Sequence, residues 1–165
     1  MVHNIHFAQF IPPTAIHYAT GTWSNAAGSV GSTIVKRKTA NAETSLITIP
    51  VEVPSNSVAL QGARLDSIEI DYELTIADLT SLTAVINKAT RGVEGAVAVV
   101  STPAFTQSPT AADSKVQGKH KLVLTITTPA WIDNDEYYCA QLSAVAPAGT
   151  VIDVIAAVAN FTLKA

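Results

Sequence analysis

The segment from residue 65 to residue 76 alternates apolar and polar side chains, and this alternation is the strongest constraint on the fold. Successive side chains of a β-strand point to opposite faces, so a period of two predicts a strand with one buried and one exposed face. The apolar face carries Ile68, Ile70, Tyr72, Leu74 and Ile76, and the other face carries Glu69, Asp71 and Glu73. We therefore expect a long strand that covers a hydrophobic core.

Seven further segments are rich in β-branched residues and are separated by clusters of turn-forming residues. They span residues 16–23, 32–37, 45–53, 83–88, 120–127, 136–144 and 151–163. Strands do not alternate with long helical patterns, which argues against a parallel α/β sheet. About eight strands predict an all-β protein built as a two-sheet antiparallel sandwich, and a jelly roll is the version that we favour.

The two ends of the chain differ from the other predicted strands. The apolar segment 6–13 contains the Pro12-Pro13 pair, which cannot join a regular ladder, so residues 1–15 are predicted to form an extended arm and residues 16–165 a single domain. Residues 151–163 are apolar on both faces, which indicates a central strand or one covered by a partner chain. Strict alternation places Ile152, Val154 and Val158 on one face. The residues predicted at a partner interface are Phe7, Phe10, Ile11, Pro12, Pro13, Ile152, Val154 and Val158.

Charged residues are scarce, at 14% of the 165 residues against about 25% in an ordinary soluble protein. The net charge is −3, and 48% of the residues are hydrophobic. These values exclude a disordered chain and a nucleic-acid-binding domain with a dominant basic surface. No apolar run is long enough to cross a membrane, and the N-terminus lacks the pattern of a signal peptide, so we expect synthesis in the cytoplasm.

Residues with metal-binding or catalytic chemistry form no recognisable motif. His3, His6 and His17 could supply imidazoles, but an ordinary surface group is the favoured interpretation. The acidic segment 133–136 could supply oxygen ligands to calcium, but a tight turn is favoured because the spacing of a calcium loop is absent. Cys139 is predicted to be a small buried side chain. Since the common enzyme signatures are also missing, we predict no catalytic residues, metal or cofactor, and no enzymatic activity.

Two surface features allow a second interpretation. The stripe of Glu69, Asp71 and Glu73 could serve glycoside hydrolysis, although charge pairing with a neighbouring strand is favoured. Trp23 and Trp131 could stack on the apolar face of a sugar. These residues keep a carbohydrate-binding or adhesion module open as the alternative function.

The apolar N-terminal segment 6–13, the strand-forming segment 151–163 and the low charge together resemble bacteriophage virion surface proteins of the capsid-decoration, head-fibre and tail-fibre types. This resemblance concerns the composition and the arrangement of predicted strands over the whole chain, and it rests on no family-specific motif. It implies a structural protein at the virion surface, assembled as a homo-oligomer with a trimer favoured. Its partners would be copies of itself and other capsid or tail proteins, with glycan as a possible ligand and neither nucleic acid nor membrane.

Overall fold

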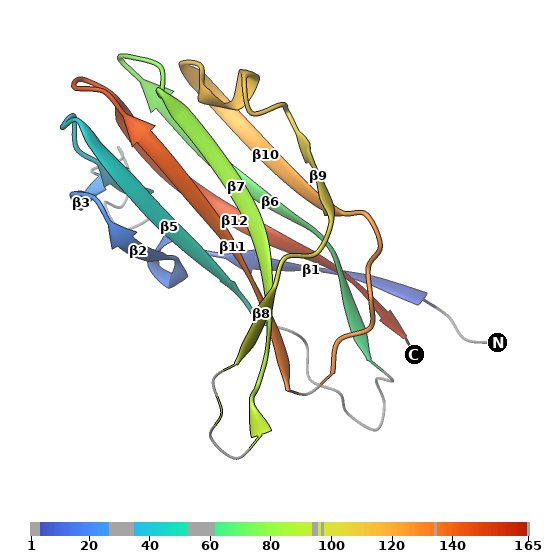
Figure 1. The fold of residues 1–165 in the computed structure, drawn as a ribbon. Helices are drawn as coiled ribbons and strands as arrows, with labels where there is room; N and C mark the ends of the chain where they lie inside the picture. The colour runs from blue at the N-terminus through green and yellow to red at the C-terminus, as the bar shows by residue number, and fades with distance from the viewer. Residues whose placement is uncertain are drawn as a thin grey trace.

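The computed structural model describes residues 4–26, 35–52, 62–93, 96, 98–133 and 135–164. Within these residues β-strands are the dominant secondary structure, and turns and loops connect them (Figure 1). The strands are β1 (Asn4–Ile11), β2 (His17–Thr20), β3 (Trp23–Ala26), β4 (Val35–Lys38), β5 (Glu43–Val51), β6 (Ala63–Thr75), β7 (Ser81–Thr90), β8 (Val99–Ser101), β9 (Phe105–Ser108), β10 (Gly118–Ile126), β11 (Glu136–Ala146) and β12 (Val151–Lys164). Short 3-10 turns, η1 (Pro13–Ala15) and η3 (Asp113–Lys115), lie between them.

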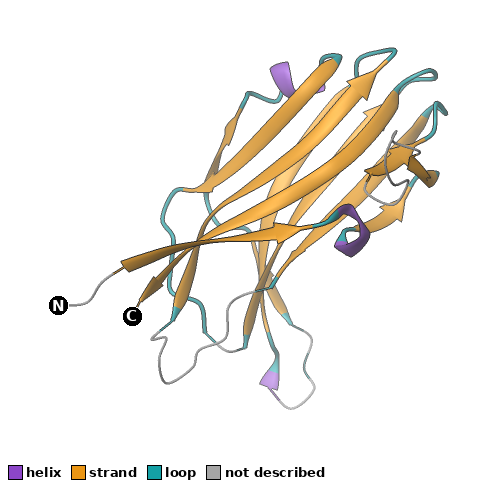
Figure 2. Ribbon diagram, turned by 180° about the vertical axis from the view of Figure 1, so that it is seen from behind, coloured by secondary structure: helices purple, strands orange, loops and turns teal. Residues whose placement is uncertain are grey.

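The strands form two antiparallel sheets that pack face to face (Figures 1 and 2). One sheet has the order β3-β4-β12-β6-β10-β9, with β1 also paired to β12, and we call it sheet A. The other, sheet B, has the order β2-β5-β11-β7-β8. The chain crosses from one sheet to the other between most consecutive long strands, so that β4-β12-β6-β10 faces β5-β11-β7-β8. This interleaved order is that of a jelly roll, and the prediction of an all-β antiparallel sandwich is confirmed.

The structure has more strands than the eight that the sequence predicts. The additional strands are β1, β3, β8 and β9, and the last three are only three or four residues long. Such short edge strands are held by backbone pairing with one neighbour and need no alternation of side chains. They therefore leave little trace in the sequence.

The N-terminal segment joins sheet A, contrary to the prediction that its proline pair prevents ladder pairing. Strand β1 pairs with β12 in an unbroken antiparallel register from Asn4 opposite Lys164 to Ile11 opposite Ala157. Both prolines follow the strand, and Pro13 starts η1. The Pro12-Pro13 pair thus ends the ladder rather than preventing it. Figure 2 shows β1 running from the N-terminal end of the chain to this helical turn.

The alternation in β6 is confirmed up to the end of the strand. Ile68, Ile70, Tyr72 and Leu74 are all buried in the core. Ile76, which the same alternation assigns to the core, is 67% exposed because β6 ends at Thr75 and Ile76 adopts a positive φ of 78° in the following turn.

A bulge in β12 changes which side chains reach the core. The register with β6 shifts between Val154 and Ala156, so Ile155 is an extra residue. Ile152 and Val154 lie in the core before the bulge, whereas Ala157 and the alternate residues after it lie in the core beyond it. Two of the predicted interface residues, Ile152 and Val154, therefore line the sandwich interior instead of a face that a partner could cover.

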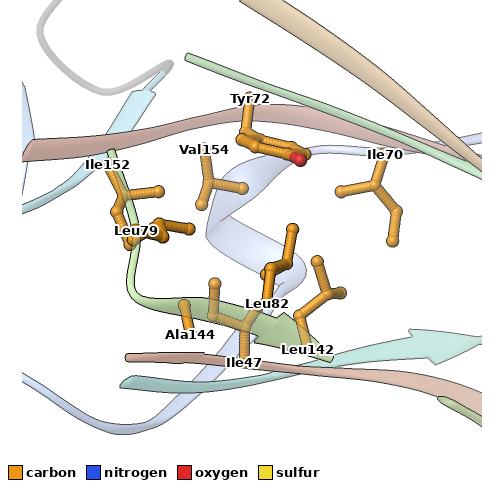
Figure 3. A pocket seen from close by; sticks show the side chains of 9 residues that line it. All are labelled: Ile47, Ile70, Tyr72, Leu79, Leu82, Leu142, Ala144, Ile152 and Val154. Carbon is orange, nitrogen blue, oxygen red and sulfur yellow. The ribbon is translucent and has the colours of Figure 1, made fainter. Parts of the chain in front are cut away.

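The two sheets meet in a dense apolar core. Figure 3 shows one part of it, where Ile70, Tyr72, Ile152 and Val154 from sheet A point toward side chains from sheet B and from the turn after β6. The facing residues are Ile47, Leu79, Leu82, Leu142 and Ala144. The space between them is only about 10 Å³ and its lining is apolar, so it holds no ligand and does not favour a water molecule.

Lys38 is fully buried at one end of the sandwich, where it ties two turns together. Its Nζ donates hydrogen bonds to the carbonyl oxygens of Thr39 (2.6 Å), Asn41 (2.6 Å) and Thr150 (3.3 Å). It also lies 3.7 Å from Glu43 Oε1. Burial lowers the pKa of Lys38, and the nearby Glu43 carboxylate opposes this effect. The ammonium group thus provides hydrogen bonds to backbone carbonyls in both the β4–β5 turn and the β11–β12 turn.

The substitution Lys38→Met keeps much of the side-chain volume but removes every one of these donors. We expect it to lower the free energy of unfolding by about 3 kcal/mol, because the buried Thr150 carbonyl, two partly buried carbonyls and Glu43 lose their partner. Urea denaturation measures the change. The control Lys36→Met removes only an exposed hydrogen bond to Asn25 and should cost less than about 0.5 kcal/mol. Equal effects of the two substitutions would contradict this role of Lys38.

Candidate functional site

A polar groove of about 590 Å³ lies on the outer face of sheet A, where β1, β12 and β6 run side by side. Its lining residues are His6, Phe7, Ala8, Arg64, Asp66, Glu69, Asn160, Phe161 and Thr162. Most of these side chains are polar, in contrast to the apolar interior on the other face of the same strands. The volume of this groove exceeds that of the groove beside Arg91 and Tyr137 (about 390 Å³) and that of the groove beside Phe10 (about 120 Å³), and we take it as the candidate site.

A second irregularity in the β6–β12 ladder shapes the groove. Asn160 lies opposite Ser67 and Phe161 lies opposite Leu65, so Asp66 is an extra residue in β6. Residues three apart in a regular strand point to opposite faces. The extra residue lets both Asp66 and Glu69 line the same groove. The acidic stripe predicted from the sequence begins at Glu69 and therefore misses Asp66.

Thr162 is the centre of a hydrogen-bonded chain in the groove, although its side chain is fully buried. Its Oγ1 donates to Asp66 Oδ2 at 2.6 Å, and the other oxygen of Asp66 accepts a hydrogen bond from Arg64 Nε at 3.1 Å. His6 Nδ1 lies 3.4 Å from the same Thr162 oxygen. Because the hydroxyl proton goes to Asp66, the oxygen can only accept from His6, so Nδ1 carries a proton. In a neutral imidazole the exposed Nε2 is then an acceptor.

Glu69 is held at the other side of the groove by two donors. Asn160 Nδ2 donates to Oε1 at 3.0 Å, and Lys121 Nζ donates to Oε2 at 2.9 Å. The hydrogen bond from Lys121 lowers the pKa of Glu69, with a further contribution from Asn160, while partial burial opposes the shift. Glu69 is thus a carboxylate at neutral pH and does not meet the requirement of glycoside hydrolysis for a protonated acid. The favoured prediction, charge pairing across strands, is confirmed for Glu69.

Trp131 stands beside the groove, next to Arg64. The guanidinium carbon of Arg64 lies 5.6 Å from the centre of the indole ring, which is a cation–π distance. Trp131 itself is 42% exposed. The ring is therefore fixed near the groove while part of its surface remains accessible.

Trp23 lies far from this groove. Trp23 pairs with Lys38 of β4, and Lys38 pairs with Ile152 near the start of β12. Arg64, which holds Trp131, pairs with Thr162, ten residues further along β12. At about 3.3 Å per residue the two tryptophans lie roughly 30 Å apart along the sheet. Trp23 instead packs on Tyr18, with ring centres 4.6 Å apart, and donates its Nε1 hydrogen to the Thr20 carbonyl at 2.9 Å. The two tryptophans predicted as glycan contacts do not form one platform.

The remaining predicted interface residues lie at or near β1 and on β12. Phe7 and Phe10 are 45% and 63% exposed, and Phe7 packs on Phe161 with ring centres 6.4 Å apart. Ile11 and Pro13 are buried, and Pro12 and Val158 are half-buried. The exposed members of the predicted set are therefore concentrated on β1 itself.

The described residues among those considered for ions form no metal-binding group. His3 and Asn134 lie outside the described residues, and within the described part no three His, Cys, Asp or Glu side chains form a group that could hold a metal ion. Asp133 and Glu136 close a turn: the Asp133 amide donates to Glu136 Oε2 at 3.2 Å, and the Glu136 amide donates to the Asp133 carbonyl at 3.1 Å. This supports the turn interpretation of the acidic segment.

Cys139 is partly buried on β11. Desolvation raises the pKa of its thiol. The side chain is therefore a weak nucleophile at neutral pH. None of the helical segments in the described residues is long and apolar enough to span a membrane.

Comparison with known proteins adds little to this geometry. No family model and no curated protein sequence matches the chain. Among solved structures, an arabinose-bound GH51 α-L-arabinofuranosidase aligns with 92% of the chain, at a TM-score of 0.36 and 9% sequence identity. The chain spans 24% of the length of that enzyme's chain. A likeness this weak carries no argument about function.

The substitution Thr162→Val tests the hydrogen-bonded chain without changing the size of the side chain. We expect it to lower the free energy of unfolding by about 1–2 kcal/mol, since Asp66 loses a buried donor. Thr125→Val, at an exposed position of β10, is the matched control and should change the value by less than about 0.5 kcal/mol. Chemical denaturation measures both. A loss at Thr162 no larger than at Thr125 would show that the network does not stabilise the fold.

Proposed function

We propose that this protein is a non-enzymatic structural protein that self-associates in a virion or similar particle, and that β1 forms the contact between copies. Jelly rolls occur in viral capsids and also in lectins, so the fold is compatible with this role but does not select it. The observation that carries the proposal is the unprotected outer edge of β1.

An exposed sheet edge is usually protected, because its free backbone groups can pair with another chain. Charged side chains, prolines and bulges are the common forms of protection. Strand β1, with the sequence NIHFAQFI, contains none of these over its eight residues. In the described part of the chain it pairs with β12 alone. Its outer edge is therefore suited to pair with a second strand.

The side chains of β1 add apolar surface to this edge. Ile5 and Phe7 are each nearly half exposed, and Phe10 is exposed by almost two thirds. The register with β12 places Ile5 and Phe7 on one face of β1 and Phe10 on the other, so a strand added at this edge would meet apolar side chains on both faces. The absence of Asp, Glu, Lys and Arg from β1 also means that two copies can approach without repulsion between like charges.

The identity of the partner follows from the strand itself. Two copies of β1 can pair in antiparallel fashion around a two-fold axis perpendicular to the sheet, which extends sheet A continuously into the second copy. This contact produces a dimer. A trimer, which the resemblance to virion proteins favours, would need another contact between copies.

Native mass measurement at micromolar concentration tests the proposal. We expect the wild-type protein to be an oligomer and the double variant Ile5→Lys/Phe10→Lys to be a monomer, because lysines on an edge strand oppose strand addition. Ile5 is 48% exposed and Phe10 63% exposed, and neither belongs to the core, so circular dichroism should show an unchanged fold.

The double variant Val99→Lys/Val100→Lys is the matched control. It places the same charges on exposed valines of β8, the edge strand of sheet B. This control should remain oligomeric. A monomeric wild-type protein, or dissociation caused by the β8 variant and not by the β1 variant, would overturn the proposal.

A further inference from the structure

We propose that the groove between β1, β12 and β6 binds a neutral saccharide. This proposal does not rest on the proposed self-association. His6, Phe7 and Ala8 of β1 line the groove, but strand addition at the edge of β1 extends sheet A within its own plane and leaves the outer face of β12 and β6 uncovered. The groove also differs from the glycan contact expected at Trp23 and Trp131 together, since Trp23 lies at the other end of the sheet.

The first argument is that the polar side chains of the groove are held in place without using all of their hydrogen-bonding capacity. Asp66 is fixed by Arg64 and Thr162, and Asn160 is fixed by its contacts with Glu69 and with Ser67 Oγ at 3.1 Å. Arrangements that are fixed before binding lose less conformational entropy when a ligand arrives.

Three groups of the groove then remain for a ligand. The terminal nitrogens of Arg64, Nε2 of His6 and Oδ1 of Asn160 make no hydrogen bond to any other described residue. They provide donors and acceptors within one groove. A hydroxyl group both donates and accepts, so a ligand with several hydroxyls matches this mixture.

The charges in and around the groove point to a neutral ligand. Asp66 is balanced by Arg64, and Glu69 is balanced by Lys121. An anion would lie close to two carboxylates, and a cation would meet Arg64. Neither sign of charge is favoured by this arrangement, whereas an uncharged polyhydroxyl ligand avoids both penalties.

Aromatic surface next to the groove matches the apolar face of a sugar ring. Trp131 is 42% exposed and is held beside the groove by Arg64. Flat aromatic rings contact the C–H groups of a pyranose while hydroxyls bond to polar neighbours. The volume of about 590 Å³ lies within the range of small-molecule sites, which suits a short oligosaccharide.

An array of neutral, sialylated and sulfated oligosaccharides tests the proposal, followed by titration of the neutral oligosaccharides that bind, monitored by NMR of the labelled protein. We expect neutral oligosaccharides to bind and to shift the resonances of His6, Asn160 and Thr162. Trp131→Ala and Arg64→Gln should each weaken binding about tenfold or more, whereas Trp23→Ala should leave the affinity unchanged.

Three outcomes would overturn this assignment: no binding to the array, binding confined to the sialylated or sulfated members, or equal loss of affinity in Trp23→Ala and Trp131→Ala. The monomeric variant Ile5→Lys/Phe10→Lys separates this proposal from self-association. Its altered residues do not line the groove, so its affinity measured by titration should equal that of the wild-type chain.

Discussion

The pairing of β12 with β6 holds the rest of the molecule together. It runs from Val151 opposite Thr75 to Leu163 opposite Ala63, almost the full length of both strands. On its other side, β12 carries β4 near its start and β1 along its second half. One strand therefore organises sheet A, fills much of the core and supplies one wall of the polar groove. Its small residues, such as Ala157 and Ala159, are fully buried and allow the facing sheet to approach closely.

The two register shifts in this ladder have separate consequences. The extra residue Ile155 sets which side chains of β12 enter the core, and the extra residue Asp66 adds a carboxylate to the outer face. Bulges often redirect side chains beside functional sites. The groove described above follows this rule: its anchored residues Asp66 and Thr162 both lie next to the second shift. The outer faces of β6 and β12 thus carry hydrogen-bonded polar side chains, whereas the inner faces of the same strands line the apolar core.

The sequence predicts the features that depend on local alternation and misses those that depend on register. The β6 core face, the sandwich and the turn near Asp133 follow from nearby residues. The bulge at Ile155 does not, so strict alternation assigns Ile152 and Val154 to the wrong environment. The groove could not be predicted for a related reason: His6 and Thr162 are separated by 156 residues, and only the β1–β12 register brings them together. Strand β1 is missed because a proline pair is compatible both with a segment that forms no strand and with a strand that ends just before it. The structure shows the second case, since β1 ends at Ile11.

The pairing of β1 with β12 also brings the first and last strands of the chain side by side. Asn4 is opposite Lys164, so the first and last described strand positions are neighbours in one ladder. Opposite residues of an antiparallel ladder have Cα atoms about 5 Å apart. Figure 1 shows β1 and the end of β12 side by side. A short flexible linker could join these positions without breaking any strand pairing, and new ends could be opened at the turn between β6 and β7. The jelly roll is therefore a suitable scaffold for circular permutation. Cargo fused to the first and last strands would emerge from the same corner of the sandwich.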